Sequence, residues 1–501
     1  MSEPHQSMGV VFPTVFPTVD PTVDSTVGPA GGRRSTTALG RAVVADALRR
    51  ADPVGSASAA RETNWRQGYL PHFRRLVEAG LPSAEAAHTI ARDGLESLHE
   101  RMRWVSPSGE GPLPTAFDGS PTPLVSETIR GEGAPDRTIS MPYAAERASG
   151  DTLRRVLAGW VDGGVVEPTC AEAVERVMAN PDWLDLSDQT IVVLGAAAEM
   201  GPLRTLLRWG AEVVAVDLPR KELWQKLIAD TRRLAGSMTV PARPGGEPVE
   251  ERLGGDLIHD LGSVTQWVGE RDGRLVLGNY VYADGATNVR VSAAVDALTQ
   301  RVVDQRGHDS VALAFLATPT DVFAVPGAAV ARSVENYAQR HTSKVLRVPL
   351  RTLSGGRLLR RNYVPGEDPG INDSVVLQQG PNYLLAKRLQ RWRATAHRAD
   401  GGVVSLKVAP PTRTRSVVKN RALAAAYAGA HRFGVQVFEP GTANTLMAIL
   451  LVHDLRSGAP AREHPWQDEA YGAAHGGLWT SAYDPRSALG IAALLGFAAA
   501  R

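Results

Sequence analysis

The stretch Ile-Val-Val-Leu-Gly-Ala-Ala-Ala-Glu-Met-Gly-Pro, residues 191–202, decides the fold of this chain. An apolar, β-branched run ends at Gly195, and small residues then lead to Gly201, where a helical pattern begins. A second apolar run at 212–216 ends at Asp217. Strand, turn, helix, strand and terminal acid in this order predict a parallel βαβ unit of the kind that binds dinucleotides.

Further short apolar runs at 275–277, 311–316 and 403–408 alternate with helical patterns. Alternation of this kind predicts an α/β protein with a doubly wound parallel Rossmann-like sheet over residues 185–440. A helical accessory region is expected at 37–184, with a Pro-, Gly- and Ser-rich linker at 105–147, and a helical C-terminal extension at 441–501. The Pro-Thr-Val repeats within residues 1–36 predict a disordered tail.

The composition excludes several classes of function. Acids and bases are interspersed along the 501 residues and leave a net charge of +2, so no nucleic-acid footprint is expected. Cys170 is the single cysteine, which excludes an internal disulfide and a cysteine metal cluster, and no metal is predicted. No apolar run reaches the roughly 18 residues of a membrane span. We therefore expect a cytoplasmic protein, with the apolar segment 488–500 as a buried or oligomer-interface helix.

Tyr383 and Lys387 carry the clearest chemical signal. Their spacing places a phenol and an ammonium one helical turn apart on the same helix face. A nearby cation lowers the pKa of a phenol, and a tyrosine so placed can pass a proton to or from a substrate oxygen. The pair predicts acid–base chemistry.

With these elements in order, residues 190–440 resemble the short-chain dehydrogenase/reductase family. The resemblance rests on the turn from Gly195 to Gly201, the Tyr-x-x-x-Lys pair, and four further positions: Asp217, Asp256, Asn279 and the 410–414 loop with Thr414. It implies an NAD(P)-dependent oxidoreductase that interconverts a carbonyl and an alcohol on a small or lipid-like substrate.

The same resemblance assigns roles to individual residues. Tyr383 would be the general acid/base, and Lys387 would hold the nicotinamide ribose and depress the tyrosine pKa. Thr318 or Thr320 would orient the substrate oxygen, and Asn288 would be the fourth catalytic residue. The implied cofactor-binding residues are Gly195, Gly201, Asp217, Asp256, Asn279, Lys387 and Thr414. Asp217 favours NAD over NADP, although Arg220 and Lys221 leave NADP open.

The chain also departs from the family pattern. Ala197, Glu199 and Met200 occupy inner positions of the glycine turn. Thr318 lies far upstream of Tyr383, which implies an insertion at about 321–373; Ser374 and Asn372 are closer in sequence and are alternatives for its role.

These departures leave two other functions open. One is a catalytically silent Rossmann-like nucleotide-binding scaffold or regulatory protein, and the other is an S-adenosylmethionine-dependent methyltransferase that uses Asp217 on the ribose. Residues such as Asp217, Asp256 and Asn279 also serve commonly as caps or turn formers. His453, His464 and His475 stand among aromatic residues and are expected to pack rather than to bind a metal.

Overall fold

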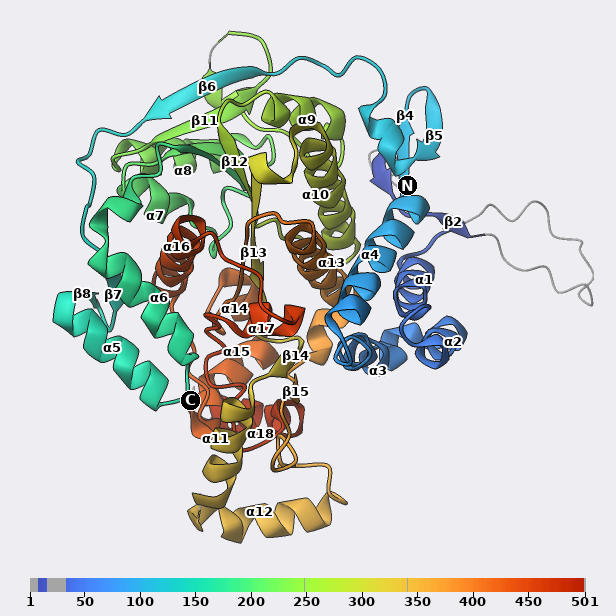
Figure 1. The fold of residues 1–501 in the computed structure, drawn as a ribbon, viewed down its shortest axis with the longest axis vertical. Coiled ribbons are helices and arrows are strands. Elements are labelled where there is room, and N and C mark those ends of the chain that lie inside the picture. Colours follow the sequence, from blue (N-terminus) through green and yellow to red (C-terminus); the bar gives the residue numbers. More distant parts are fainter. Residues whose placement is uncertain (1–7, 16–32, 247, 340, 500–501) are drawn as a thin grey trace, which may run out of the picture.

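The computed structural model describes residues 8–15, 33–246, 248–339 and 341–499. Its centre is a seven-stranded sheet in the order β16-β13-β12-β9-β10-β11-β6 (Figure 1). Six strands run parallel, whereas β6 at one edge is antiparallel to β11. The strands are β6 (Val125–Arg130), β9 (Gln189–Leu194), β10 (Glu212–Val216), β11 (Ser237–Ala242), β12 (Arg274–Asn279), β13 (Val311–Ala317) and β16 (Val404–Val408).

The parallel strands follow one another in the chain as β9, β10, β11, β12, β13 and β16, and their order across the sheet reverses between β9 and β12. Sheets that bind nucleotides do so beyond the carboxyl ends of the strands at such a reversal. The architecture is α/β and consistent with a Rossmann-like fold. The five predicted runs coincide with β9, β10, β12, β13 and β16, whereas β11 and β6 were not predicted.

Alternating side chains of each strand face two separate cores. In β9, Val192 and Leu194 join one core, while Ile191 and Val193 join the other. Helices cover both faces, which explains why inner strands such as β9 and β10 carry continuous apolar runs (Figure 1). The first core contains α9 (Leu261–Gly269), α10 (Gly285–Arg306) and α13 (Gly380–Ala399); the second contains α7 (Leu203–Arg208), α8 (Lys221–Arg232) and α16 (Pro440–Ser457).

The N-terminal helices pack on the first core and are not separate from the sheet domain. Trp65, Phe73 and Leu98 belong to the same buried cluster as Leu277 of β12. These helices are α1 (Thr36–Leu48), α2 (Pro53–Arg61), α3 (Trp65–Glu78) and α4 (Ala84–Arg101); α5 (Gly150–Asp162) and α6 (Pro168–Ala179) lie on the second core.

Part of the predicted tail is ordered. Strand β1 (Gly9–Val11) is buried, and the Val10 amide donates to Ile258 O at 2.9 Å, so the prediction of disorder is wrong for this stretch. The apolar run Val10, Val11, Phe12 explains the burial. Strands β2 (Thr14–Val15) and β3 (Arg33–Arg34) pair with each other, whereas residues 1–7 and 16–32 of the predicted tail lie outside the described residues.

The predicted linker at 105–147 contains strands. β4 (Arg103–Ser106) and β5 (Gly109–Pro112) form a hairpin, as do β7 (Ser140–Tyr143) and β8 (Glu146–Ser149). Between them, β6 joins the central sheet. The accessory region is therefore not all-helical, and it supplies one edge of the sheet.

Residues 321–373, which were predicted to be an insertion, lie outside the central sheet. β14 (Val322–Val325) and β15 (Gly370–Asp373) pair antiparallel, and α11 (Gly327–Gln339) and α12 (His341–Leu353) lie between them. The C-terminal part adds α14 (Arg415–Lys419), α15 (Arg421–Gly429), α17 (Pro465–Ala470) and α18 (Pro485–Ala499). Within the described ranges, no helix is both long and apolar enough to cross a bilayer.

Candidate active site

Lys387 lies near the carboxyl edge of the sheet and links α13 to two strands. Its Nζ donates to Leu316 O at 3.2 Å, near the end of β13, and to Gln390 Oε1 at 3.1 Å. The Gln390 Nε2 in turn donates to the Asn279 Oδ1 at 3.2 Å, at the end of β12. Burial lowers the pKa of Lys387 to about 8, so a substantial fraction of the amine is unprotonated near neutral pH.

Tyr383 lies one turn earlier on α13, next to the two threonines that follow β13. Its phenol interacts with the Thr318 side chain, and Thr318 Oγ1 lies 2.9 Å from Thr320 Oγ1. The Gln379 Nε2 donates to Thr320 Oγ1 at 2.9 Å. The structure thus brings Tyr383, Lys387, Thr318 and Thr320 into one cluster, although the threonines are far upstream in sequence.

The expected depression of the Tyr383 pKa is not found. Burial raises the pKa of Tyr383 to about 12, and the hydrogen bonds of Lys387 are directed to Leu316 and Gln390. The phenol is therefore protonated at neutral pH and suited to donate a hydrogen bond or a proton.

Buried ion pairs hold α13 in place beneath this cluster. Asp321 accepts from Arg388 at 3.1 Å and from Arg391 at 2.8 Å, and Arg391 also pairs with Glu469 of α17 at 2.6 Å. Asp321 directly follows Thr320, so these pairs fix the loop that carries both threonines against the helix that carries Tyr383. The two arginines keep the pKa of Asp321 below its usual range.

The glycine turn at 195–201 follows β9 and is tightly closed. Gly195 has a φ of +85°, and a Cβ there would lie 2.9 Å from backbone atoms of Tyr280, so this position requires glycine. Five amides between residues 195 and 201 donate inside the protein: two to Val216 O, one to Asp217, and two within the turn. The following helix α7 has six residues and is preceded by Pro202.

A dinucleotide would find partners at its two ends but not at its centre. Asp217 accepts from Ala197 N and Leu218 N, both at 2.8 Å, and each carboxylate oxygen retains a second lone pair for a ribose hydroxyl. Asn279 and Lys387 lie at the other end, beside the strand reversal. The pyrophosphate, by contrast, meets a turn whose amides are largely already bonded, so the residues fit the nucleoside ends and not the phosphates.

The remaining sequence-predicted residues serve local structure. Asp256 pairs with His259 at 2.9 Å and accepts from Ile258 N, which keeps its pKa below the usual range. Asn288 Oδ1 accepts from Ala283 N at 3.2 Å and closes the loop before α10.

Thr414 and Glu199 lie at either end of a contact between α14 and the glycine turn. Thr414 is the N-cap residue of α14, and its Oγ1 lies 3.0 Å from Ser416 Oγ. Glu199, an inner residue of the glycine turn, accepts from Arg415 N at 2.8 Å and Nε at 2.7 Å, so its carboxylate is paired.

An apolar cavity opens beside Thr320. Thr320 and Ser374 contribute hydroxyls, and the walls come from α15, α18 and the 433–437 stretch, including Tyr427, Phe433 and Ala492. Of the two alternatives considered for the threonine role, Ser374 lines the cavity and donates to Asn372, which is fully buried and is not among the lining residues. A more open hollow on the outer side of α15 shares Tyr427, Val435 and Val437 with this cavity.

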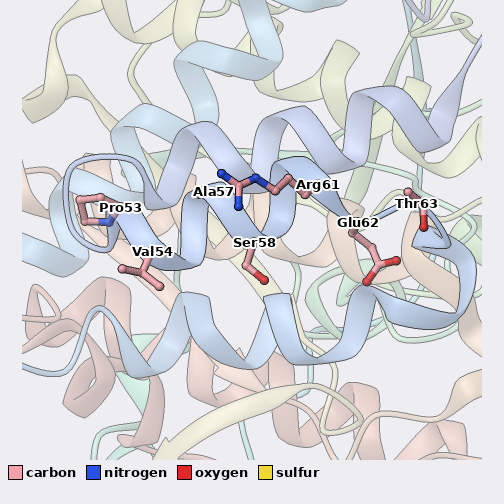
Figure 2. Close-up of a pocket in the computed structure, with 7 residues that line it drawn as sticks. All are labelled: Pro53, Val54, Ala57, Ser58, Arg61, Glu62 and Thr63. Atoms are coloured by element: carbon pink, nitrogen blue, oxygen red, sulfur yellow. The ribbon is translucent and has the colours of Figure 1, made fainter.

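A second surface hollow lies elsewhere. Figure 2 shows its seven lining residues, which come from α2 and the turn after it: Pro53, Val54, Ala57, Ser58, Arg61, Glu62 and Thr63. It contains none of the predicted site residues. Across the described residues, no group of three or more histidine, cysteine or acidic side chains is arranged to hold a metal ion.

Sequence reasoning missed the part played by Gln390 and Gln379. Gln390 lies three residues after Lys387 and seven after Tyr383, so all three share one helix face. The signal in the sequence was a glutamine at helical spacing from Tyr383 and Lys387. Comparison with protein-family models gives no match, and comparison with curated proteins gives no significant match.

Proposed function

We propose that this chain is an NAD(P)-dependent oxidoreductase that interconverts a carbonyl and an alcohol on an apolar substrate. The observation that carries the proposal is the cluster of Tyr383, Thr318 and Lys387 at the carboxyl ends of β12 and β13, beside the strand reversal. A substrate oxygen placed between the phenol and the Thr318 hydroxyl would have two hydrogen-bond partners.

The roles of the residues follow from their protonation states. The Tyr383 phenol donates its proton to the carbonyl oxygen as the alcohol forms, and takes a proton back in the reverse direction. Thr318 orients that oxygen. Lys387 and Asn279 would hold the ribose nearest the reacting centre. The nicotinamide, when bound, would supply or accept the hydride.

The cofactor and substrate preferences rest on two features. Asp217 disfavours a 2′-phosphate and Lys221 pairs with Glu251 at 2.6 Å, which favours NAD, whereas the charge of Arg220 acts on Asp217 and leaves NADP open. The cavity beside Thr320 has a volume of about 70 Å³ and is lined mainly by apolar side chains, which favours a small alkyl ketone, aldehyde or alcohol.

A second candidate is a catalytically silent Rossmann-like protein. The closed turn at 195–201 favours it, because a pyrophosphate would have to displace internal hydrogen bonds from that turn. The two proposals differ in whether the chain turns over a substrate with a dinucleotide; the silent protein would not, whether or not it binds a nucleotide.

The test is calorimetric titration with NADH and NADPH, followed by turnover of apolar aldehydes and ketones. We expect NADH to bind, and Tyr383→Phe to retain binding while losing roughly 100-fold or more in turnover. Tyr143→Phe, which alters a tyrosine packed on Trp160, is the matched control and should leave both unchanged. Absence of binding by either dinucleotide would favour the silent protein, and full turnover by Tyr383→Phe would refute the role of the phenol.

A further inference from the structure

Helix α12 projects from the body of the protein, and arginines attach it to the preceding helix. Figure 1 shows it at the end of the molecule opposite β6. The Arg347 guanidinium stacks on the Tyr337 ring of α11, 4.1 Å from its centroid, and is 9% exposed. Arg351 Nη1 donates to the Tyr337 hydroxyl at 3.2 Å. The arginines therefore attach α12 to the preceding helix.

The C-terminal half of the same helix exposes apolar side chains. Val348 is 57% exposed, Leu350 36% and Leu353 86%, and the two leucines lie three residues apart on a common face. We call the two leucines the α12 face. A helix end that turns Arg347 toward the protein and two leucines toward the surroundings differs from an ordinary surface helix, which indicates that something apolar covers the leucines.

The charge of this region identifies the covering partner. Residues 341–361 contain six lysines and arginines and no acidic residue. Arg360 pairs with Asp484, but Arg351 and Arg357 remain exposed beside the α12 face. A cationic helix with an exposed apolar face is the pattern of segments that lie in the plane of an anionic membrane surface.

A second copy of the chain fits this face less well. A twofold contact would bring the same surface of each copy together and would oppose two cation-rich segments that carry no compensating acid. An anionic bilayer supplies both the negative charge and the apolar boundary. Each exposed cation near such a surface adds electrostatic attraction that weakens with salt.

We propose that α12 is a membrane-docking helix, which places the α12 face at the boundary between headgroups and acyl chains of an anionic lipid surface. The chain segment after α12 is bonded to the start of α18, since Leu359 N donates to Ser487 O at 3.3 Å. Helix α18 also exposes Leu494, Leu495 and Phe497, so a second apolar patch is available on an element connected to the same region. This inference does not depend on the proposed oxidoreductase activity.

The test is flotation of the full chain with vesicles of phosphatidylcholine alone or mixed with phosphatidylglycerol, at low and high salt. The wild-type protein is expected to float with the anionic vesicles only, and less at high salt. Leu350→Ser with Leu353→Ser should reduce the bound fraction at least tenfold, because these side chains supply the inserted apolar surface. Val54→Ser, at an exposed valine of α2, is the matched control and should bind as wild type.

Three results would overturn the proposal. These are no flotation with anionic vesicles, equal flotation with neutral ones, and flotation that the double substitution leaves intact. Sedimentation of the protein without vesicles tests whether a second copy covers the α12 face instead. If the wild type is a dimer that does not bind vesicles, and the double substitution makes it a monomer, the α12 face is a dimer contact. Circular dichroism of each variant establishes that the fold is retained, since the substituted side chains are exposed.

Discussion

The lowered pKa of Lys387 predicts an unusual chemical reactivity for this one lysine. With a pKa of about 8, about one tenth of its amine is unprotonated at pH 7, against roughly 0.03% for a lysine of ordinary pKa near 10.5. The difference is about 300-fold in the reactive form. Labelling with acetic anhydride at a series of pH values, followed by peptide mass spectrometry, should give a midpoint near pH 8 for Lys387.

The experiment contains its own comparison. Lys221 pairs with Glu251, which raises its pKa above 10.5, so its labelling midpoint should lie higher than that of Lys387 in the same digest. Gln390→Glu places a carboxylate next to the ammonium and should raise the Lys387 midpoint by more than one pH unit. A Lys387 midpoint at or above pH 10 would refute the assignment of a desolvated amine. The midpoint pH of labelling is compared rather than the labelling rate, because the rate also depends on how easily the reagent reaches each lysine.

The same shift predicts a pH dependence of stability. Folding lowers the pKa of Lys387, so between pH 8 and 10.5 the unfolded chain binds more protons than the folded one. The contribution of this group to the free energy of unfolding therefore rises with pH across that window. Below the window the amine is charged in both states, and the full cost of burying that charge destabilises the fold. Lys387→Met should remove that rise in urea unfolding measured from pH 7 to 10.5, and an unchanged slope would contradict the prediction.

Three further predictions concern stability and reactivity. Gly195→Ala should lower the free energy of unfolding by roughly 3 kcal/mol or more, since its Cβ would meet backbone atoms. Gly285→Ala, at a φ of +59° with open space around it, should cost about 1 kcal/mol. Equal losses in urea unfolding would refute the steric argument. Asp321→Asn should cost about 3–5 kcal/mol, because it leaves the buried Arg388 without its ion-pair partner, whereas Arg391 keeps Glu469; a loss below about 1 kcal/mol, measured in the same way, would contradict this. Burial raises the pKa of Cys170 to about 12, so its thiol should react with a thiol reagent only as fast as the protein opens, and a complete reaction of the native protein within seconds would be inconsistent with that burial.

Local sequence patterns were sufficient for the parallel core of the fold. The apolar runs that end at Gly195 and Asp217 predicted β9 and β10 because strands buried on both faces leave a continuous apolar signature. Strand β6 was missed because Val-Ser-Glu-Thr-Ile-Arg at 125–130 is mostly polar, with Val125 and Ile129 as its apolar residues, and its partner β11 lies far away in the chain. Pairing of that kind depends on tertiary contacts and leaves little local trace.

The candidate site was only partly predictable. The Tyr383 and Lys387 pair was visible as a helical spacing, but Thr318 approaches it only because β14 and β15 bring the chain back after a long excursion. The protonation states could not be predicted at all. Spacing suggested that the ammonium would dominate the pKa of the phenol, whereas desolvation of both groups is the larger effect in the folded chain.

Strand β6 has a consequence for how this molecule can be divided. Its six residues pair with all of β11, and they come from the region between α4 and α5, before the first parallel strand in the chain. Removing the N-terminal part at residue 185 would leave the backbone of β11 as an open edge, able to pair with another chain. The α/β core is therefore expected to aggregate when expressed without the N-terminal part, and the two halves of the sequence constitute one cooperative folding unit.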